Sequence, residues 1–396
     1  MLNLVNKPIS YEGFTFNQNF LDNFNNETRR VNPFSFNKFA NDRGINNKSI
    51  IDILLELEKE VQLQDVPKNI NKRITFYTAK NLVLEFYEKL GLKLPVEEII
   101  EGKNPIFKTI IDKSIGHSSV GHHGDETQIN FQVGFNGTIE SMLTIAHECA
   151  HAICGHYSSL AKLIDEQNQI IAKFGNPSKE LEDFNQNKFD KFMKSQGIFS
   201  HDCLVEIETH IVENLFIEFL INKGTITNED AKIYHQGKNN SFRNNLKLIF
   251  EENTIYSLIR EIKSKTNSKD ETISADEFKI LHKELSKIHH YNDHMHKLIF
   301  ISRRTSPQVD EAGSYGQYRL RYVIAEIIST VWMERFLQSN KKEKAEMLKN
   351  FKEYLQNSEK YDIFSVLSVL IPGTKIEDVI DEFKQIHQTK NNQITP

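Results

Sequence analysis

Cysteine is scarce in this chain, and long apolar runs and an excess of one charge are missing. The 396 residues include only Cys149, Cys154 and Cys203, which are too few and too odd in number for a disulfide framework and favour a reducing compartment. No run of about 18 apolar residues occurs, which excludes a conventional membrane-spanning helix. An ordinary packed core must therefore hold the fold together.

The two signs of charge nearly balance. The chain has 49 Lys and Arg residues against 54 Asp and Glu residues, a formal net charge of -5, and no basic face that would favour nucleic acid or a membrane surface as a partner. The first twenty residues lack the charged segment and apolar core of a secretory signal. We expect a cytoplasmic protein, with export by a route that needs no cleaved signal left open, and the oligomeric state is not indicated.

Helical periodicity dominates the sequence. A Gly, His and Ser-rich segment over 112–126 is typical of a loop, and residues 128–135 alternate between apolar and polar side chains as a strand does. The predicted helices cover 49–61, 75–92, 138–157, 203–222 and 318–338. We therefore expect a mainly α fold with one small β-sheet, comprising an N-terminal helical region (1–110) and a second domain (111–396).

The strand over 128–135 runs directly into a helix that carries an HExxH motif, His147-Glu148-Cys149-Ala150-His151. Each residue of an α-helix turns by about 100°, so two histidines four residues apart lie about 40° from each other on one face and can bind a single zinc ion. Glu148 then lies beside the open coordination position, where it could take a proton from a water molecule. The motif predicts a catalytic zinc site.

The surroundings of the motif support a helix at this position. Thr138 follows a turn at Asn136 and Gly137 and is a plausible N-cap, and Gly155 suits the end of the helix. A polar triad in an otherwise apolar helix is costly unless something satisfies it. The apolar positions are Ile139, Met142, Leu143, Ile145 and Ala146.

A catalytic zinc site normally has three protein ligands, so one more is needed. His156 lies roughly 180° from His147 on an ideal helix, which makes it a poor candidate. In the segment LVEIETHIVENLFIEFL, Glu206, His210 and Glu213 share one helical face and Glu208 points the other way. We predict Glu206 as the third ligand and Glu213 as the acceptor that orients a ligating imidazole.

These segments together resemble the thimet oligopeptidase and oligoendopeptidase F family of zinc peptidases. The zinc-helix signature of that family is similar to NGTIESMLTIAHECAHAICGHY, and its third-ligand helix, with a second Glu seven residues after the zinc-binding Glu, is similar to VEIETHIVEN. The resemblance implies a helical zinc peptidase whose small sheet lines a channel for peptides, with residues 1–110 as one wall. It also implies zinc binding by His147, His151 and Glu206.

The family's tyrosine-rich helix, which stabilises the tetrahedral intermediate, resembles SYGQYRLRYVIAEIISTVWMERF. It offers Tyr315, Tyr318 and Tyr322 as donors to the developing oxyanion, and we favour Tyr315 and Tyr322. The chain departs from the family pattern in Ala150, where Gly is usual, and in Cys154, where many members carry a third histidine. It also has an inserted stretch around residues 158–200, which we expect to be helical.

The predicted function is hydrolysis of peptide bonds, in oligopeptides, by one zinc ion per chain with Glu148 as the general base. One alternative is an effector-type protease that is delivered into another cell, or a protease directed at a particular protein. Another is a zinc-stabilised peptide-binding module without catalysis, in which Cys154 would close the metal site as a fourth ligand. The strand over 128–135 also has two interpretations, either an edge to which a peptide adds or a half-buried strand of the sheet.

Overall fold

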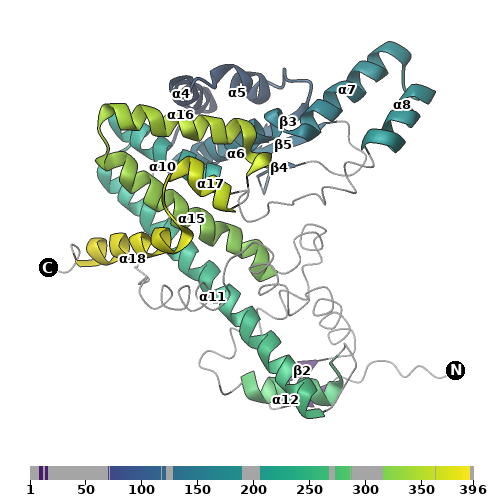
Figure 1. The fold of residues 1–396 in the computed structure, drawn as a ribbon, viewed down its shortest axis with the longest axis vertical. Helices are drawn as coiled ribbons and strands as arrows, with labels where there is room; N and C mark the ends of the chain where they lie inside the picture. Colours follow the sequence, from purple (N-terminus) through teal and green to yellow (C-terminus); the bar gives the residue numbers. More distant parts are fainter. Residues whose placement is uncertain are drawn as a thin grey trace. The chain divides into compact units, whose positions relative to one another are not determined.

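The computed structural model describes residues 9–11, 14–16, 70, 72–116, 118–121, 128–189, 206–266, 273–285, 287, 315–361 and 363–392. Helices make up most of the described residues, and three strands form one small sheet, so the predicted mainly α fold is confirmed (Figure 1). A separate antiparallel pair joins β1 (Ile9–Tyr11) to β2 (Phe14–Phe16). The helix predicted over 49–61 lies outside the described residues.

The chain divides into two compact units. Unit 1 comprises Met1–Lys59 and Arg243–Leu320, and unit 2 comprises Glu60–Phe242 and Arg321–Pro396. Helices α11 (Asn228–Thr266) and α15 (Tyr315–Gln338) each contribute to both units, and α12 (Ala275–Leu285) belongs to unit 1. The boundary expected at residue 110 stays a prediction.

The sheet of unit 2 places its last strand in the middle. The order is β3 (Phe107–Asp112), β5 (Ile129–Gly134), β4 (Ser119–Gly121), with β5 parallel to β3 and antiparallel to β4. Phe131 pairs with Thr109 on one side and with Val120 on the other, so the interpretation of this strand as an open edge for a peptide is wrong. Between Asn130 and Gln132 the strand has a partner on both sides, and the alternative of a strand within a small sheet holds.

The HExxH helix, α6 (Ile139–Tyr157), follows β5 directly. Thr138 is its N-cap, as predicted, and forms a reciprocal capping box with Ser141 after the positive-φ turn at Gly137. Helix α6 packs against β5 and against α4, α5, α10 and α16. Its apolar positions are almost completely buried, and the hydroxyl of Tyr87 donates to the carbonyl of Ala146 at 2.8 Å. This helix is therefore the centre of the unit 2 core.

Helix α10 (Ile207–Asn222) is the main partner of α6. Its aromatic residues Phe216 and Phe219 lie against Phe86 of α4, and their ring centroids are 5.0 Å and 5.9 Å, respectively, from that of Phe86.

The other helices of unit 2 are α4 (Phe76–Lys89), α5 (Lys93–Ile100), α7 (Ser159–Phe174), α8 (Lys179–Phe184), the π-helix η1 (Asn185–Phe189), α16 (Lys341–Asn357), the short 3-10 helix η2 (Ser358–Lys360), α17 (Ile363–Leu370) and α18 (Ile376–Asn392).

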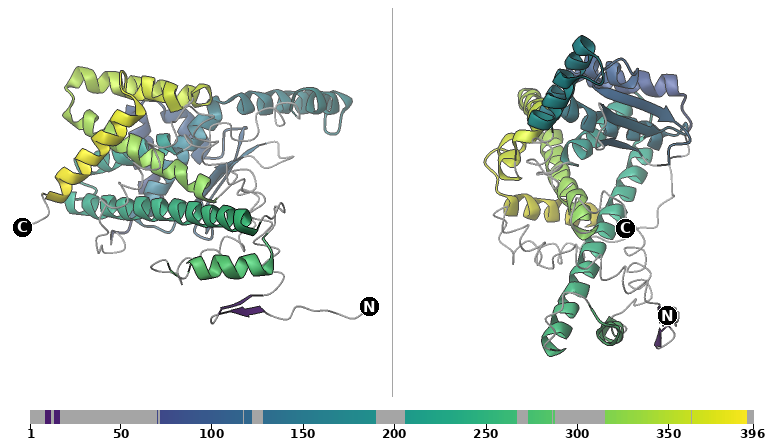
Figure 2. Two further views of the ribbon diagram at one scale, coloured as in Figure 1. Left: turned by 60° about the horizontal axis from the view of Figure 1, so that its bottom comes forward. Right: turned by 90° about the vertical axis from the view of Figure 1, so that its right-hand side faces the viewer.

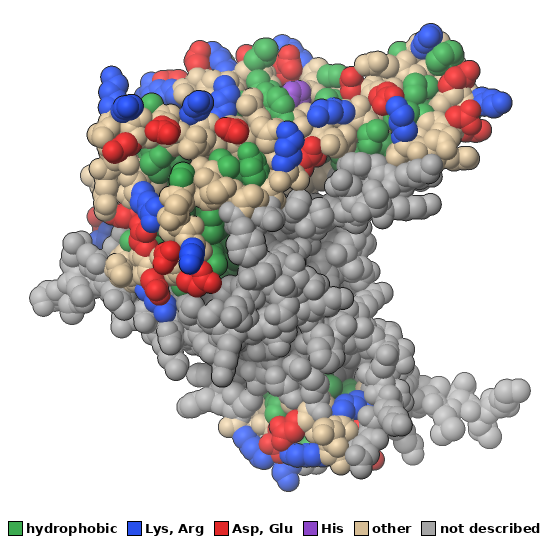
Figure 3. Space-filling view, in the orientation of Figure 1, with side chains coloured by type: hydrophobic (Ala, Val, Ile, Leu, Met, Phe, Trp, Pro, Cys, Tyr) green, Lys and Arg blue, Asp and Glu red, His purple; other side chains and the backbone are tan. Residues whose placement is uncertain are grey.

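The stretch predicted as a helical insertion, 158–200, is helical as far as it is described. It forms α7, α8 and η1, which project from unit 2 beyond the sheet (Figure 2). Among the described residues on the face drawn in Figure 3, basic and acidic side chains are interspersed, in agreement with the balanced charge of the sequence. No helix among the described residues is long and apolar enough to cross a membrane.

Candidate metal centre

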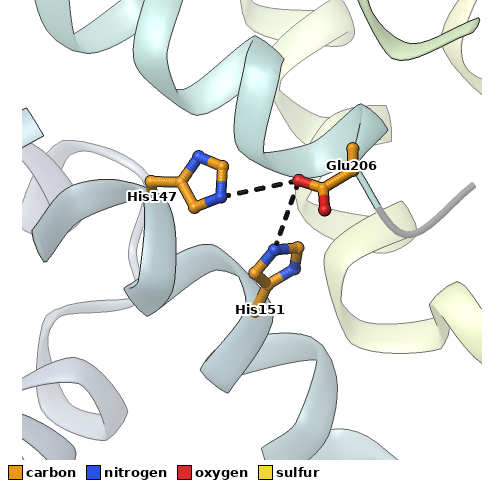
Figure 4. Close-up of side chains that lie close together, drawn as sticks. All are labelled: His147, His151 and Glu206. Atoms are coloured by element: carbon orange, nitrogen blue, oxygen red, sulfur yellow. Dashed lines mark ion pairs between the residues drawn. The ribbon is translucent and has the colours of Figure 1, made fainter. Parts of the chain in front are cut away.

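Three side chains from two elements converge where α6 meets the beginning of α10. His147 and His151 project from successive turns of α6, and Glu206 reaches toward them from the N-cap position of α10 (Figure 4). One ligand atom from each residue lies within 4.8 Å of the other two. The side chains are largely buried, with exposed fractions of 18% for His147, 14% for His151 and 5% for Glu206. This cluster could hold a metal ion.

The two distances from Glu206 to the imidazoles are close to those of a tetrahedral metal site. The Nε2 atoms of His147 and His151 each lie 3.5 Å from Oε2 of Glu206. Metal–ligand bonds of about 2.1 Å at tetrahedral angles separate two ligand atoms by about 3.4 Å, whereas a strong charge-assisted hydrogen bond would bring them to about 2.8 Å. Two imidazole nitrogens and one carboxylate oxygen form a donor set suited to zinc.

A buried carboxylate orients each imidazole from its other ring nitrogen. Nδ1 of His147 lies 2.8 Å from Oε1 of Glu213, and Nδ1 of His151 lies 3.1 Å from Oε1 of Glu208. When Nδ1–H donates to a carboxylate, the lone pair remains on Nε2, which is the atom that faces Glu206 in both histidines. The second oxygen of Glu208 accepts a hydrogen bond from the hydroxyl of Tyr354 at 3.1 Å. Both rings are therefore held in the orientation that a metal ligand needs.

The electrostatics of the cluster favour a cation. Burial works to raise the pKa of Glu206, but His151 and His147 lower that pKa to about 2. Burial works to lower the pKa of His151, and the Glu206 and Glu208 carboxylates outweigh it and raise that pKa well above its usual range. Protons and a metal ion thus compete for the same nitrogen atoms, so metal affinity should fall as the pH is lowered.

Glu148 lies on the turn of α6 between the two histidines and is 5% exposed. Among the described residues it does not belong to the ligand cluster, which consists of His147, His151 and Glu206 alone. A carboxylate that is close to a metal site without being a ligand can accept a proton from a water molecule there. This is the position in which the motif places a general base.

Of the two favoured tyrosine candidates, Tyr322 has a described side chain and Tyr315 does not. The ring of Tyr322 lies 6.4 Å from the ring of His210, which is one helical turn beyond Glu206 in α10. The guanidinium of Arg321 lies 5.8 Å from the centre of the Tyr322 ring. Tyr322 therefore lies near His210 of α10, whereas the side chain of Tyr315 lies outside the described residues.

Cys154, the possible fourth ligand, is not in the cluster that the described residues form. Burial and the neighbouring Glu208 carboxylate raise the pKa of its thiol well above the usual range, although hydrogen bonding works in the opposite direction. A protonated thiol is a poor metal ligand. Among the described residues, three candidate protein ligands therefore remain.

The expectation that Glu208 points away from the site is wrong. Glu206 is the N-cap and has backbone angles of φ -106° and ψ -2°, so it does not follow the helical wheel on which the two carboxylates were compared. Glu208 lies in the first turn and reaches His151, while Glu213, two turns along, reaches His147. The signal in the sequence was the three carboxylates of VEIETHIVEN, in which the candidate ligand Glu206 is followed by Glu208 and Glu213.

Comparison with known proteins adds little to this geometry. No protein-family model matches the chain, and no curated protein matches it either. Among solved structures it is similar to one described as the "crystal structure of putative peptidase from Chlamydophila abortus", with 13% sequence identity and a TM-score of 0.45. The match covers 95% of this chain and 55% of the other, so the chain spans about half the length of that structure.

Proposed function

We propose that the protein is a zinc metallopeptidase that hydrolyses peptide bonds in oligopeptides. The observation that carries this proposal is the orientation of both HExxH imidazoles, since a buried carboxylate lies at each Nδ1 and both Nε2 atoms face Glu206. The sequence motifs support placing the protein near the oligoendopeptidase F peptidases. We further propose that residues 1–110 form one wall of a peptide channel and that residues 111–396 form the catalytic domain.

His147, His151 and Glu206 would hold one zinc ion, and Glu213 and Glu208 would keep the two imidazoles in place. A bound zinc ion supplies Lewis-acid chemistry, which polarises the scissile carbonyl group and makes a water molecule more acidic. Among described residues that are not in the cluster, Glu148 is the carboxylate that the motif places closest to that water.

The protein's own residues then account for the proton transfers. The Glu148 carboxylate accepts a proton from the attacking water and returns it to the nitrogen of the leaving amine, which prevents expulsion of an amide anion. Tyr322 and Tyr315 are the proposed donors to the carbonyl oxygen as negative charge develops on it. A donor of this kind lowers the barrier because its hydrogen bond strengthens in the transition state.

The test compares the wild type with Glu148→Gln on a peptide library, with zinc content measured on both proteins. We expect Glu148→Gln to retain one zinc ion per chain and to lose activity by about 10²- to 10⁴-fold, because only the proton transfer is removed. Glu140→Gln is the matched control, since Glu140 lies on the same helix but in its first turn, outside the metal cluster. Equal cleavage by the wild type and Glu148→Gln would contradict the proposal.

Substrates of graded length separate the peptidase from its alternatives. Cleavage of short peptides but not of folded proteins supports an oligopeptidase, and the reverse pattern indicates a protease directed at a particular protein. Peptide binding that depends on zinc, with no cleavage by the wild type, would instead identify a non-catalytic module.

A further inference from the structure

A row of alternating basic and acidic side chains begins at His147 of the metal cluster and continues through residues of three further helices. Oε1 of Glu213 lies 2.8 Å from Nδ1 of His147, and its Oε2 lies 2.9 Å from Nζ of Lys238. The same Nζ lies 3.3 Å from Oε2 of Glu326, which in turn lies 2.9 Å from Nδ1 of His210. The residues come from α6, α10, α11 and α15, all within unit 2.

Lys238 is at the centre of this row and is the cation that its two carboxylates share. The exposed side-chain fractions are 11% for Lys238, 14% for Glu213 and 9% for Glu326. Two carboxylates that are this strongly shielded from water repel each other unless a cation lies between them. Without Lys238, the two would have to separate or take up water, and Glu213 could not keep its position on His147.

The two histidines of the cluster are held in different ways. Glu208, which orients His151, receives a hydroxyl hydrogen bond from Tyr354 and forms no ion pair with a lysine in the described part of the chain. Glu213, which orients His147, is fixed by the Lys238 ammonium. Burial raises the pKa of the Tyr234 hydroxyl most strongly, and the Glu213 carboxylate raises it further. A loss at Lys238 should therefore affect His147 and leave His151 in place.

We propose that Lys238 is a positioning residue of the metal centre, which holds Glu213 against His147 and Glu326 against His210 by bridging the two carboxylates. The inference rests on the metal-binding part of the proposed function. It adds that His210, which is not in the ligand cluster, is fixed beside Tyr322 by the same lysine. One buried cation would then hold in place both the proposed zinc ligand His147 and His210, whose ring lies near the ring of Tyr322.

The experiment measures zinc affinity by competition with a chromophoric chelator, in the absence of substrate. We expect Lys238→Met to weaken zinc binding by about 10- to 100-fold, the usual effect of losing a group that orients a metal ligand. Lys238→Arg, which keeps the charge, should recover most of the affinity. In a Glu213→Gln background Lys238→Met should add little, because both changes act through the same imidazole.

Lys263→Met is the matched control. Lys263 forms a similarly shielded ion pair with Glu277, at 3.0 Å and with exposed fractions of 14% and 8%, but it lies in unit 1. This variant should lower the stability of unit 1 and leave zinc affinity unchanged. If Lys238→Met does not fold, Lys238→Gln, which keeps a polar side chain, replaces it in the same comparison.

Zinc affinity of the Lys238 variant within twofold of the wild type would overturn the inference, as would equal weakening by the Lys263 control. Failure of the peptidase proposal gives a different result. If the protein cleaves no peptide but its variants show the expected order of zinc affinities, the role of Lys238 as a positioning residue is supported and the peptidase proposal is not. If the wild type binds no zinc, both the peptidase proposal and the role of Lys238 are overturned.

Discussion

At the scale of single residues, the metal cluster is asymmetric in how its imidazoles are supported. The carboxylate of Glu213 is part of a row of charges, whereas Glu208 is supported by the neutral hydroxyl of Tyr354. Both carboxylates are acceptors for Nδ1, so both fix the tautomer of the histidine that they contact. The two supports can therefore be tested separately.

Glu208→Gln should weaken zinc binding by about 10- to 100-fold, because an amide is a weaker acceptor for Nδ1–H than a carboxylate and contributes no negative charge. Zinc competition at neutral pH measures the effect. Glu218→Gln is the control, since Glu218 lies on the same helix but is not among the residues of the cluster. Unchanged affinity in Glu208→Gln would show that His151 keeps its orientation without this contact.

At the scale of elements, helix boundaries were predictable wherever a local signal exists. The turn at Gly137 with the Thr138 cap marked the beginning of α6, and Gly91, with φ of 68°, follows the end of α4. Strands β3 and β4 were not predicted. Strand β4 has only three residues, and β3, although as long as β5, has the sequence FKTIID without regular alternation; each is defined by its pairing with β5. Hydrophobic periodicity along a segment indicates its local structure but does not indicate which distant strand it pairs with.

The beginning of α12 in unit 1 offers a test of stability that is independent of zinc. Oε2 of Glu277 accepts from the backbone N–H of Ser274 at 2.8 Å, and Lys263 and Thr266 also donate to this carboxylate. Burial works to raise the pKa of Glu277, but these donors lower it to about 2. The pKa in the folded state is thus below the unfolded value, so the stabilisation is present above about pH 4.5 and is lost as the pH falls toward 2.

Glu277→Gln should lower the free energy of unfolding by about 1–3 kcal/mol at pH 7 and flatten its dependence on pH between about 4.5 and 2. Urea unfolding followed by circular dichroism at several pH values measures both effects. Asp276→Asn is the control, because Asp276 is 88% exposed and should change stability by less than about 0.5 kcal/mol. An unchanged pH profile in Glu277→Gln would contradict the assignment.

At the scale of the whole molecule, the sequence indicated the candidate metal ligands better than it indicated the residues that surround them. The HExxH spacing alone brings His147 and His151 to one face, and this geometry depends only on the α-helix. Lys238 and Glu326 could not be found in this way, since they lie on different helices and more than 80 residues apart in the sequence, so that no short motif contains them both. Their approach is a result of tertiary packing.

Metal binding should stabilise unit 2 and leave unit 1 largely unaffected. A zinc ion would join α6 to the beginning of α10, and a ligand that binds only the folded state at 1,000 times its Kd adds about 4 kcal/mol of stability. Removal of the metal with a chelator should therefore speed amide hydrogen exchange in α6 and α10, while exchange in α12 of unit 1 stays the same.

Glu206→Ala provides the control for this measurement, because it removes a ligand and should make exchange insensitive to zinc. Re-addition of zinc to the chelator-treated wild type should restore protection in α6 and α10. If chelation changed exchange in α12 as strongly as in α6, the metal would stabilise the chain as a whole. If it changed neither, no metal would join these helices. The Nε2 atoms of the two histidines and the Glu206 carboxylate would then contact one another only through ion pairs or hydrogen bonds within the core.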